Sequence, residues 1–135
     1  MTKRPHTGAV SAEMAAAIHG NTELVTGEFS GLAGRDVAAD RDGVAYLEQF
    51  IERNRDNWDG DARHSLANVL GSFLGAALAA AGGKWVETEH GPGVSFGPDF
   101  VAFPFAKTGK FIEGGEGESL LSFYDTAVVM AAATR

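Results

Sequence analysis

Apolar residues recur at helical spacing through the middle of the chain. Asp40 or Asp42 is suited to cap a first helical turn. Behind them, apolar residues follow at intervals of three, four and seven, which is the spacing of one helix face: Val44, Leu47, Ile51 and Trp58. The pattern predicts an amphipathic helix that buries this face.

A second helix is predicted directly after the first. The segment Asp59-Gly60-Asp61 ends the first helix and caps the second, whose apolar residues cover more than half of its circumference. Residues 65–83 carry no charge and include Gly71 and Gly75 at the spacing that brings membrane helices together. Their summed hydropathy is too low for insertion, so we predict a buried core helix and no membrane span.

After residue 83 the apolar period changes from helical to alternating. Residues 84–89 are predicted to form a strand, residues 90–93 its turn, and residues 94–96 a short returning strand. Residues 100–103 follow as a third strand, which Pro104 ends or places at the edge of the sheet. These segments predict a small antiparallel meander.

Two more helices are predicted behind the meander. The first covers residues 105–112 and ends at Gly114-Gly115, and the last begins at about Ser119. Glu116 and Glu118 precede this last helix, where carboxylates interact favourably with the helix dipole. The predicted fold class is α+β: a single domain in which a three-stranded antiparallel meander packs with three to four helices, in the order α-α-β-β-β-α-α.

The first 39 residues differ from the rest of the chain. They are rich in Ala, Gly, Thr and Ser, and they contain one short helical patch at residues 12–18 followed by several glycines. Four apolar residues would gain nothing from exposure in a free tail: Leu24, Val25, Phe29 and Leu32. We therefore predict an N-terminal arm over residues 1–39, partly docked or flexible, and a single α+β domain over residues 40–135.

Composition narrows the classes of function. The chain has 135 residues, of which 44% are hydrophobic, as expected for one folded domain. Its 11 Lys and Arg against 18 Asp and Glu give a formal charge of −7, which opposes binding to nucleic acid. The absence of cysteine excludes disulfide scaffolds and thiolate sites. The first residues contain no apolar signal segment, so we predict a cytoplasmic protein.

The sequence contains no familiar catalytic motif, such as a nucleophile elbow, a P-loop or a metalloprotease helix. Its four histidines stand far apart, whereas metal ligands are usually paired at short spacing. We therefore expect no metal and no cofactor, and the interpretation leans against an enzyme.

The strongest candidate for chemistry is the strand at residues 84–89. Alternation places Trp85, Glu87 and Glu89 on one face of the strand, and His90 follows them. The carboxylates of the two glutamates would lie about 6.5 to 7 Å apart, a separation that an acid/base pair could use. Glu87, Glu89 and His90 are thus candidate catalytic residues, and Trp85 is a candidate binding residue. A solvated strand face with an exposed turn explains the same residues without chemistry, and this second interpretation is favoured.

Two charged groups are candidates for binding. The first group contains four acidic residues spaced by four, four and three positions, which would place them on one face of the predicted helix: Glu48, Glu52, Asp56 and Asp59. They are either the solvated side of a helix or a docking surface for a basic protein. Lys107 and Lys110, beside Gly109, are either an anion site or solvated surface.

Four short motifs carry a resemblance to other proteins: LGxxLG at residues 70–75, GGxW at 82–85, FPFxKxxK at 103–110 and GExESLxxFY at 115–124. Together they resemble a group of small bacterial proteins that share a domain of unknown function, over roughly residues 66–124. The resemblance implies a bacterial α+β domain and transfers no catalytic residue.

Three functions remain open at this stage. The first is a binding or regulatory module, of the immunity or antitoxin kind, that recognises a basic protein partner. The second is a small enzyme with its site between Trp85 and Lys107. The third is a small-molecule-binding homodimer, paired through the strand near residues 100–105 or through the helix face of Gly71 and Gly75.

Overall fold

The chain forms five α-helices and a four-stranded antiparallel sheet within residues 6–114 and 119–133, the parts that this computed structural model describes. The strand order in the sheet is β1-β2-β3-β4. In chain order the elements are β1 (His6–Ala9), α1 (Ala12–Ala33), α2 (Arg41–Asn54), the 3₁₀ helix η1 (Arg55–Asn57), α3 (Gly60–Ala80), β2 (Lys84–Thr88), β3 (Gly91–Ser95), β4 (Val101–Ala102), α4 (Pro104–Ile112) and α5 (Leu120–Ala133). The predicted α+β class is therefore confirmed.

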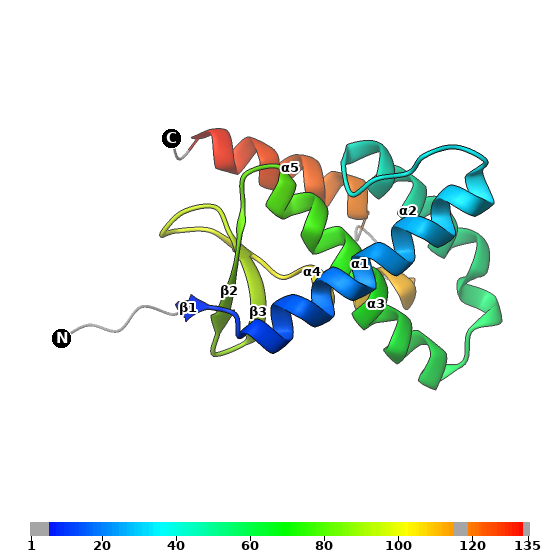
Figure 1. The fold of residues 1–135 in the computed structure, drawn as a ribbon, viewed down its shortest axis with the longest axis horizontal. Coiled ribbons are helices and arrows are strands. Elements are labelled where there is room, and N and C mark those ends of the chain that lie inside the picture. Colours follow the sequence, from blue (N-terminus) through cyan, green and yellow to red (C-terminus); the bar gives the residue numbers. More distant parts are fainter. Residues whose placement is uncertain (1–5, 115–118, 134–135) are drawn as a thin grey trace.

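Helix α3 lies at the centre of the fold. It packs against α1 and α4, and α1 crosses in front of it in Figure 1. The Asp59 carboxylate caps α3 by accepting a hydrogen bond from the amide of Ala62 at 2.8 Å, as predicted. Phe73, Leu74 and Leu78 are completely buried. No helix in the described ranges is long and apolar enough to cross a membrane.

Helix α2 forms as its apolar spacing predicts. The Asp40 side chain accepts a hydrogen bond from the Gly43 amide at 2.9 Å, and Val44, Leu47 and Ile51 are fully buried. The helix ends at Asn54 and η1 follows, so the predicted continuation to Trp58 is wrong.

Helix α1 is three times longer than the predicted patch at residues 12–18. It contains 22 residues and ends at Gly34, whose φ of 68° closes the last turn. Ile18, Val25 and Phe29 are buried along one side. Their burial outweighs the cost of the helix-interior glycines, about 1 kcal/mol each, which had argued for a loop.

The sheet has four strands, so the predicted three-stranded meander is incomplete. Strand β1 pairs antiparallel with β2, with Gly8 opposite Glu87 and Ala9 opposite Val86. No alternating pattern marks β1, because its strand conformation comes from pairing with the edge of β2. The predicted order thus lacks β1 and α1. The boundary at residue 40 stays a prediction, and Val25 and Phe29 share one buried cluster with α2 and α3.

The antiparallel succession of β2, β3 and β4 is confirmed, but the predicted turn at residues 90–93 is wrong, because β3 begins at Gly91 and residues 91–93 pair with β2. Trp85 lies opposite Val94, and Val94 lies opposite Ala102. The third strand is shorter than predicted, because Pro104 occupies the first turn of α4 and its fixed φ suits that position. The predicted roles of Gly115, Glu116 and Glu118 lie outside the described residues.

Two glycines on α3 let neighbouring elements approach its backbone. A Cβ atom on Gly75 would clash with the Trp85 ring and lie 3.1 Å from Cγ of Pro104. A Cβ atom on Gly71 would lie 2.7 Å from the Phe105 ring and 3.1 Å from its Cα. This face is therefore occupied by the chain's own side chains rather than by a second copy.

The close approach at Gly75 predicts a stability difference between two glycine substitutions. We expect Gly75→Ala to lower the free energy of unfolding by about 1–3 kcal/mol, because the added methyl group overpacks the Trp85 contact. Gly20→Ala is the matched control, since Gly20 lies inside α1 with open space around it. It should raise stability by about 0.5–1 kcal/mol. Urea unfolding measures both, and an equal effect of the two would contradict the packing.

A paired arginine and aspartate connect α2 to α5, and they predict a pH effect. Arg41 donates two hydrogen bonds of 2.9 Å to Asp125 and thereby lowers the pKa of that carboxyl group. The stabilising contribution is complete at neutral pH and is lost as the pH falls through the lowered pKa. Asp125→Asn should therefore destabilise the protein at pH 7, and by less below about pH 4. Asp36→Asn, at an exposed site, is the control, and a pH-independent difference would refute the pairing.

Candidate functional site

Strand β4 leaves one edge of the sheet open. The Phe96 amide donates a hydrogen bond to the Phe100 carbonyl at 3.0 Å, so these two residues form a hydrogen-bonded pair. Hydrogen-bonded pairs alternate along an antiparallel ladder, so Val94 and Ala102 form the next one. The N–H and C=O groups of Val101, between them, must therefore point away from β3.

Val101 and Ala102 of this edge strand also line a cleft of about 460 Å³. We call it the β4 cleft; its lining comes from the β2–β3 turn, β4 and its flanks, α4 and α5: His90, Phe100, Val101, Ala102, Phe103, Ala106, Lys107, Lys110 and Phe123. Its size falls within the range of natural ligand sites. None of these described lining residues is acidic.

Local sequence explains how the cleft is formed. Gly93 has no side chain, and a Cβ atom there would lie 2.6 Å from Val101 and 3.2 Å from the Phe103 ring. The two side chains therefore sit close over β3. The Phe103 ring meets His90 edge-on at 6.3 Å, and the ammonium of Lys107 lies 5.6 Å from the centre of the Phe123 ring. The walls of the cleft are thus aromatic, with cationic groups placed between them.

The charge of the cleft differs from that of the whole chain. Lys107 and Lys110 are two of only four lysines in a chain whose formal charge is −7. Both lysines belong to α4, where they lie three residues apart and thus on one helix face. The sequence left these two lysines as either an anion site or solvated surface, and the structure places them with His90 in the lining of one cleft.

The predicted catalytic group is only partly brought together. Trp85 packs on α3 and lies 5.7 Å from the Phe105 ring, so its ring is a packing element of the core. Glu87 lies within β2 opposite Pro92. Glu89 and His90 are neighbours in the exposed turn, 3.5 Å apart, with about 70% of each side chain accessible. Catalysis by Glu87, Glu89 and His90 stays a prediction.

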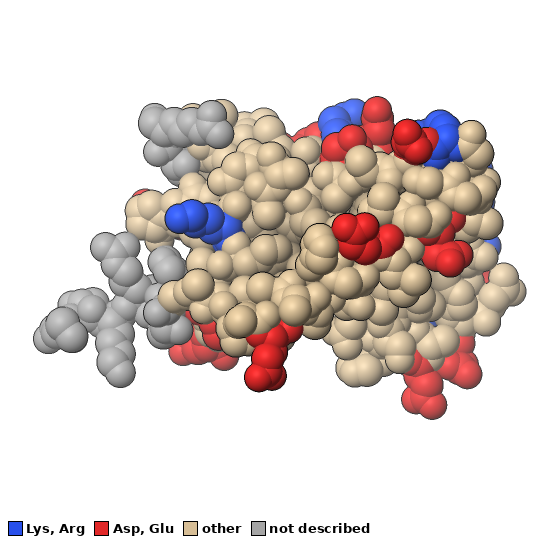
Figure 2. Space-filling view, viewed as in Figure 1, with Lys and Arg blue, Asp and Glu red and all other residues tan. Residues whose placement is uncertain are grey.

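The four acidic residues of the predicted docking surface do not share one helix face. Glu48 and Glu52 lie on α2, whereas Asp56 lies in η1 and Asp59 caps α3. Acidic side chains on the face that carries α1 are scattered over a wide neutral area (Figure 2). A docking role for this group stays a prediction.

Glu48 has a structural role that the sequence did not reveal. Its carboxylate accepts hydrogen bonds from the Ser119 hydroxyl at 2.8 Å and from the Leu121 amide at 3.0 Å. The Ser119 oxygen in turn accepts a hydrogen bond from the Ser122 amide at 3.2 Å. Glu48 therefore satisfies one unpaired amide at the start of α5, that of Leu121, across 73 residues of sequence. It also holds the Ser119 hydroxyl, which satisfies a second amide, that of Ser122.

This arrangement predicts different effects for the two glutamates of α2. Glu48→Ala should lower the free energy of unfolding by about 1–2 kcal/mol, because it removes a charged partner from the first turn of α5. Glu52→Ala, one turn later and exposed, should change stability by less than about 0.5 kcal/mol. Thermal unfolding followed by circular dichroism compares them. Equal destabilisation would show that α5 does not depend on Glu48.

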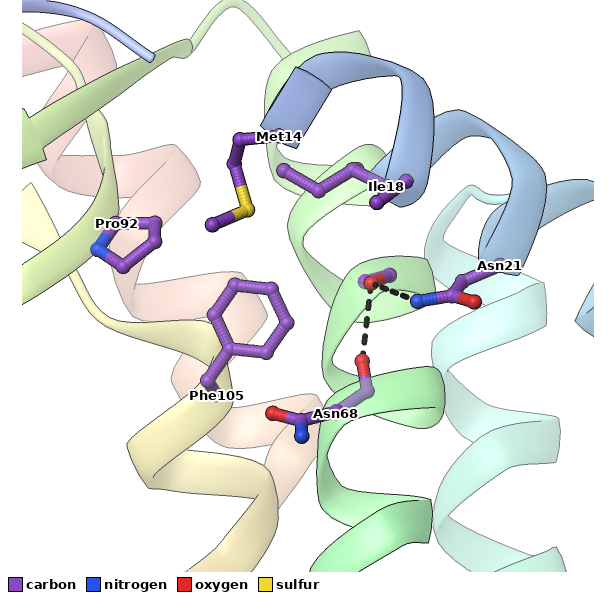
Figure 3. Close-up of a pocket in the computed structure, with 8 residues that line it drawn as sticks. Met14, Ile18, Asn21, Asn68, Pro92 and Phe105 are labelled. Carbon is purple, nitrogen blue, oxygen red and sulfur yellow. Dashed lines mark hydrogen bonds between the residues drawn. The ribbon is translucent and has the colours of Figure 1, made fainter. Parts of the chain in front are cut away.

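A second cavity, of about 410 Å³, lies between α1, α3, β3 and α4. We call it the α1–α3 cavity; its lining is Met14, Ala17, Ile18, Asn21, Asn68, Ser72, Pro92 and Phe105 (Figure 3). The sequence did not reveal this cavity, because half of its lining residues belong to α1, a segment that was predicted to be part of a partly docked or flexible N-terminal arm. Within the residues described, no cluster of three or more His, Asp or Glu is placed to hold a metal ion.

Comparison with known proteins does not assign the chain to a family. No family model, no curated protein and no solved structure matches the chain. The resemblance carried by the four short motifs therefore stays a prediction.

Proposed function

We propose that the protein is a protein-binding module that takes an extended, acidic segment of a partner protein into the β4 cleft. The observation that carries the proposal is the outward-facing backbone of Val101, a residue that lines the same cleft as cationic and aromatic side chains. An open sheet edge beside side-chain pockets is a recurring way of binding peptides.

The backbone part of the interaction is small. Strand β4 has two residues, so an added strand gains one donor and one acceptor from Val101. Hydrogen bonds of this kind contribute about 1 kcal/mol each. They fix the direction and register of the segment, and most of the affinity must come from its side chains.

The side chains of the cleft favour carboxylates next to apolar residues. Lys107, Lys110 and His90 supply cationic or donor groups, and Phe100, Phe103 and Phe123 supply apolar surface. A basic segment would meet like charges here, which strongly opposes binding. The chain's overall charge gives no long-range attraction for an acidic partner, so binding depends on contacts inside the cleft.

A second copy of the chain is a poorer occupant. Two copies paired through β4 would bring their own Lys107 and Lys110 side chains to the same groove, which costs electrostatic energy. An acidic partner segment avoids this cost. The basic partner expected from the acidic residues would need a different surface, and that prediction remains open to test; these residues are Glu48, Glu52, Asp56 and Asp59.

Selection of displayed random peptides on the immobilised protein tests the proposal. We expect enriched peptides to contain Asp or Glu beside aromatic or β-branched residues. Lys110→Glu should weaken the best peptide about tenfold, because it reverses a charge in the cleft. Lys84→Glu is the matched control, since it makes the same charge change at an exposed residue outside the cleft, and it should leave the affinity unchanged.

The proposal also predicts where the peptide lies. Nuclear Overhauser contacts should connect backbone protons of the peptide with the Val101 amide. Enriched peptides without acidic residues, equal losses in the two charge reversals, or no enrichment would each refute the proposal. Light scattering that shows a dimer lost in Lys110→Glu would assign the cleft to a second copy instead.

A further inference from the structure

We propose that the α1–α3 cavity is a separate site for a small uncharged molecule that combines a flat or aliphatic body with an amide or carbonyl group. The cavity shares no lining residue with the β4 cleft. Its chemistry is also different, because no charged side chain lines it among the residues that the structure describes.

Apolar side chains from four elements form the body of the cavity. Met14 and Phe105 point toward each other across it, and Pro92 and Ile18 lie on opposite sides (Figure 3). Phe105 is held in place because its backbone and ring pack on Gly71 of α3. The walls therefore come from packed helices and a strand, which gives a site that is formed before a ligand enters.

Polar groups lie at one end only. The Asn21 amide donates a hydrogen bond to the Ser72 hydroxyl at 3.2 Å, which itself donates to the Asn68 carbonyl at 2.9 Å (dashed in Figure 3). These bonds leave the side-chain oxygen of Asn21 and the whole side-chain amide of Asn68, which is exposed at the mouth of the cavity, without a protein partner in the described part of the chain. An amide offers a donor and an acceptor, so it matches a ligand that carries both.

The absence of lining charge determines which ligands are rejected. The exposed residues Ala17 and Asn68 leave the cavity open to solvent on one side, so a carboxylate or an ammonium group would lose part of its water on entering and would find no lining charge to replace it. An uncharged amide loses less water and regains hydrogen bonds from Asn21 and Asn68. The site therefore discriminates between molecules of the same shape by their charge.

The position of the cavity relates it to the proposed peptide site. Phe105 faces the α1–α3 cavity and Phe103 faces the β4 cleft, at the start of the same helix. In the same way, Pro92 of β3 lines one site, and His90, two residues earlier in the β2–β3 turn, lines the other. The two sites thus lie on either side of a shared wall, although occupation of the cavity does not depend on peptide binding.

Three isosteric probes test the inference: benzamide, which is uncharged, benzoate, which is an anion, and benzamidine, which is a cation. Nuclear magnetic resonance titration of the full chain should show that benzamide, at millimolar concentration, shifts the side-chain amide signals of Asn21 and Asn68. Benzoate and benzamidine should bind about tenfold or more weakly, because each must lose its hydration without gaining an opposite charge.

Two alanine substitutions on α1 provide a matched pair. Ala17→Leu places a larger side chain at the wall of the cavity and should abolish the benzamide shifts, whereas Ala16→Leu, also exposed but outside the lining, should retain them. Equal binding of the three probes, loss of binding in both variants, or no shift with benzamide would each overturn the inference. None of these results bears on the peptide selection, so the two proposals fail separately.

Discussion

The fold depends on the close approach of aromatic rings to the backbone of α3. Gly71 and Gly75, one turn apart, leave the helix surface bare where Phe105 and Trp85 pack on it. A ring seated against the backbone buries a large apolar area, and an aromatic side chain buries about 150–250 Å². The two contacts tie α4 and β2 to the same helix. The bare backbone of α3 therefore sets the position of the sheet relative to the helices.

Both candidate sites follow from this attachment. Phe105 seats the first turn of α4, and the same turn carries Phe103 and Lys107 into the β4 cleft. On its other side, the Phe105 ring forms a wall of the α1–α3 cavity. Packing of the core does not determine whether the residues that line the two sites are charged. The chemistry of the two sites can therefore differ. One is cationic and aromatic, and the other is neutral with amides at one end.

The sequence predicted the parts of the fold that bury a regular face. The spacing of Val44, Leu47 and Ile51 located α2, and alternation located β2 and the second half of β3. It failed where tertiary contacts override local preference: the glycines of α1 argued for a loop, and β1 exists only through its partner strand. Lys107, Lys110 and His90 were recognisable, whereas their convergence, and the use of Glu48 as a cap for α5, depend on contacts between residues far apart in the sequence.

Strand β4 presents the outward-facing backbone groups of Val101 beside a cationic cleft, and amide hydrogen exchange of the unliganded protein tests this arrangement most directly. Ala102 is hydrogen-bonded to Val94 across the ladder, whereas the Val101 amide faces outward. Exchange followed by nuclear magnetic resonance should therefore be slow for the Ala102 amide and fast for the Val101 amide. Equal protection of the two amides would mean that the edge is already covered, and it would contradict the account.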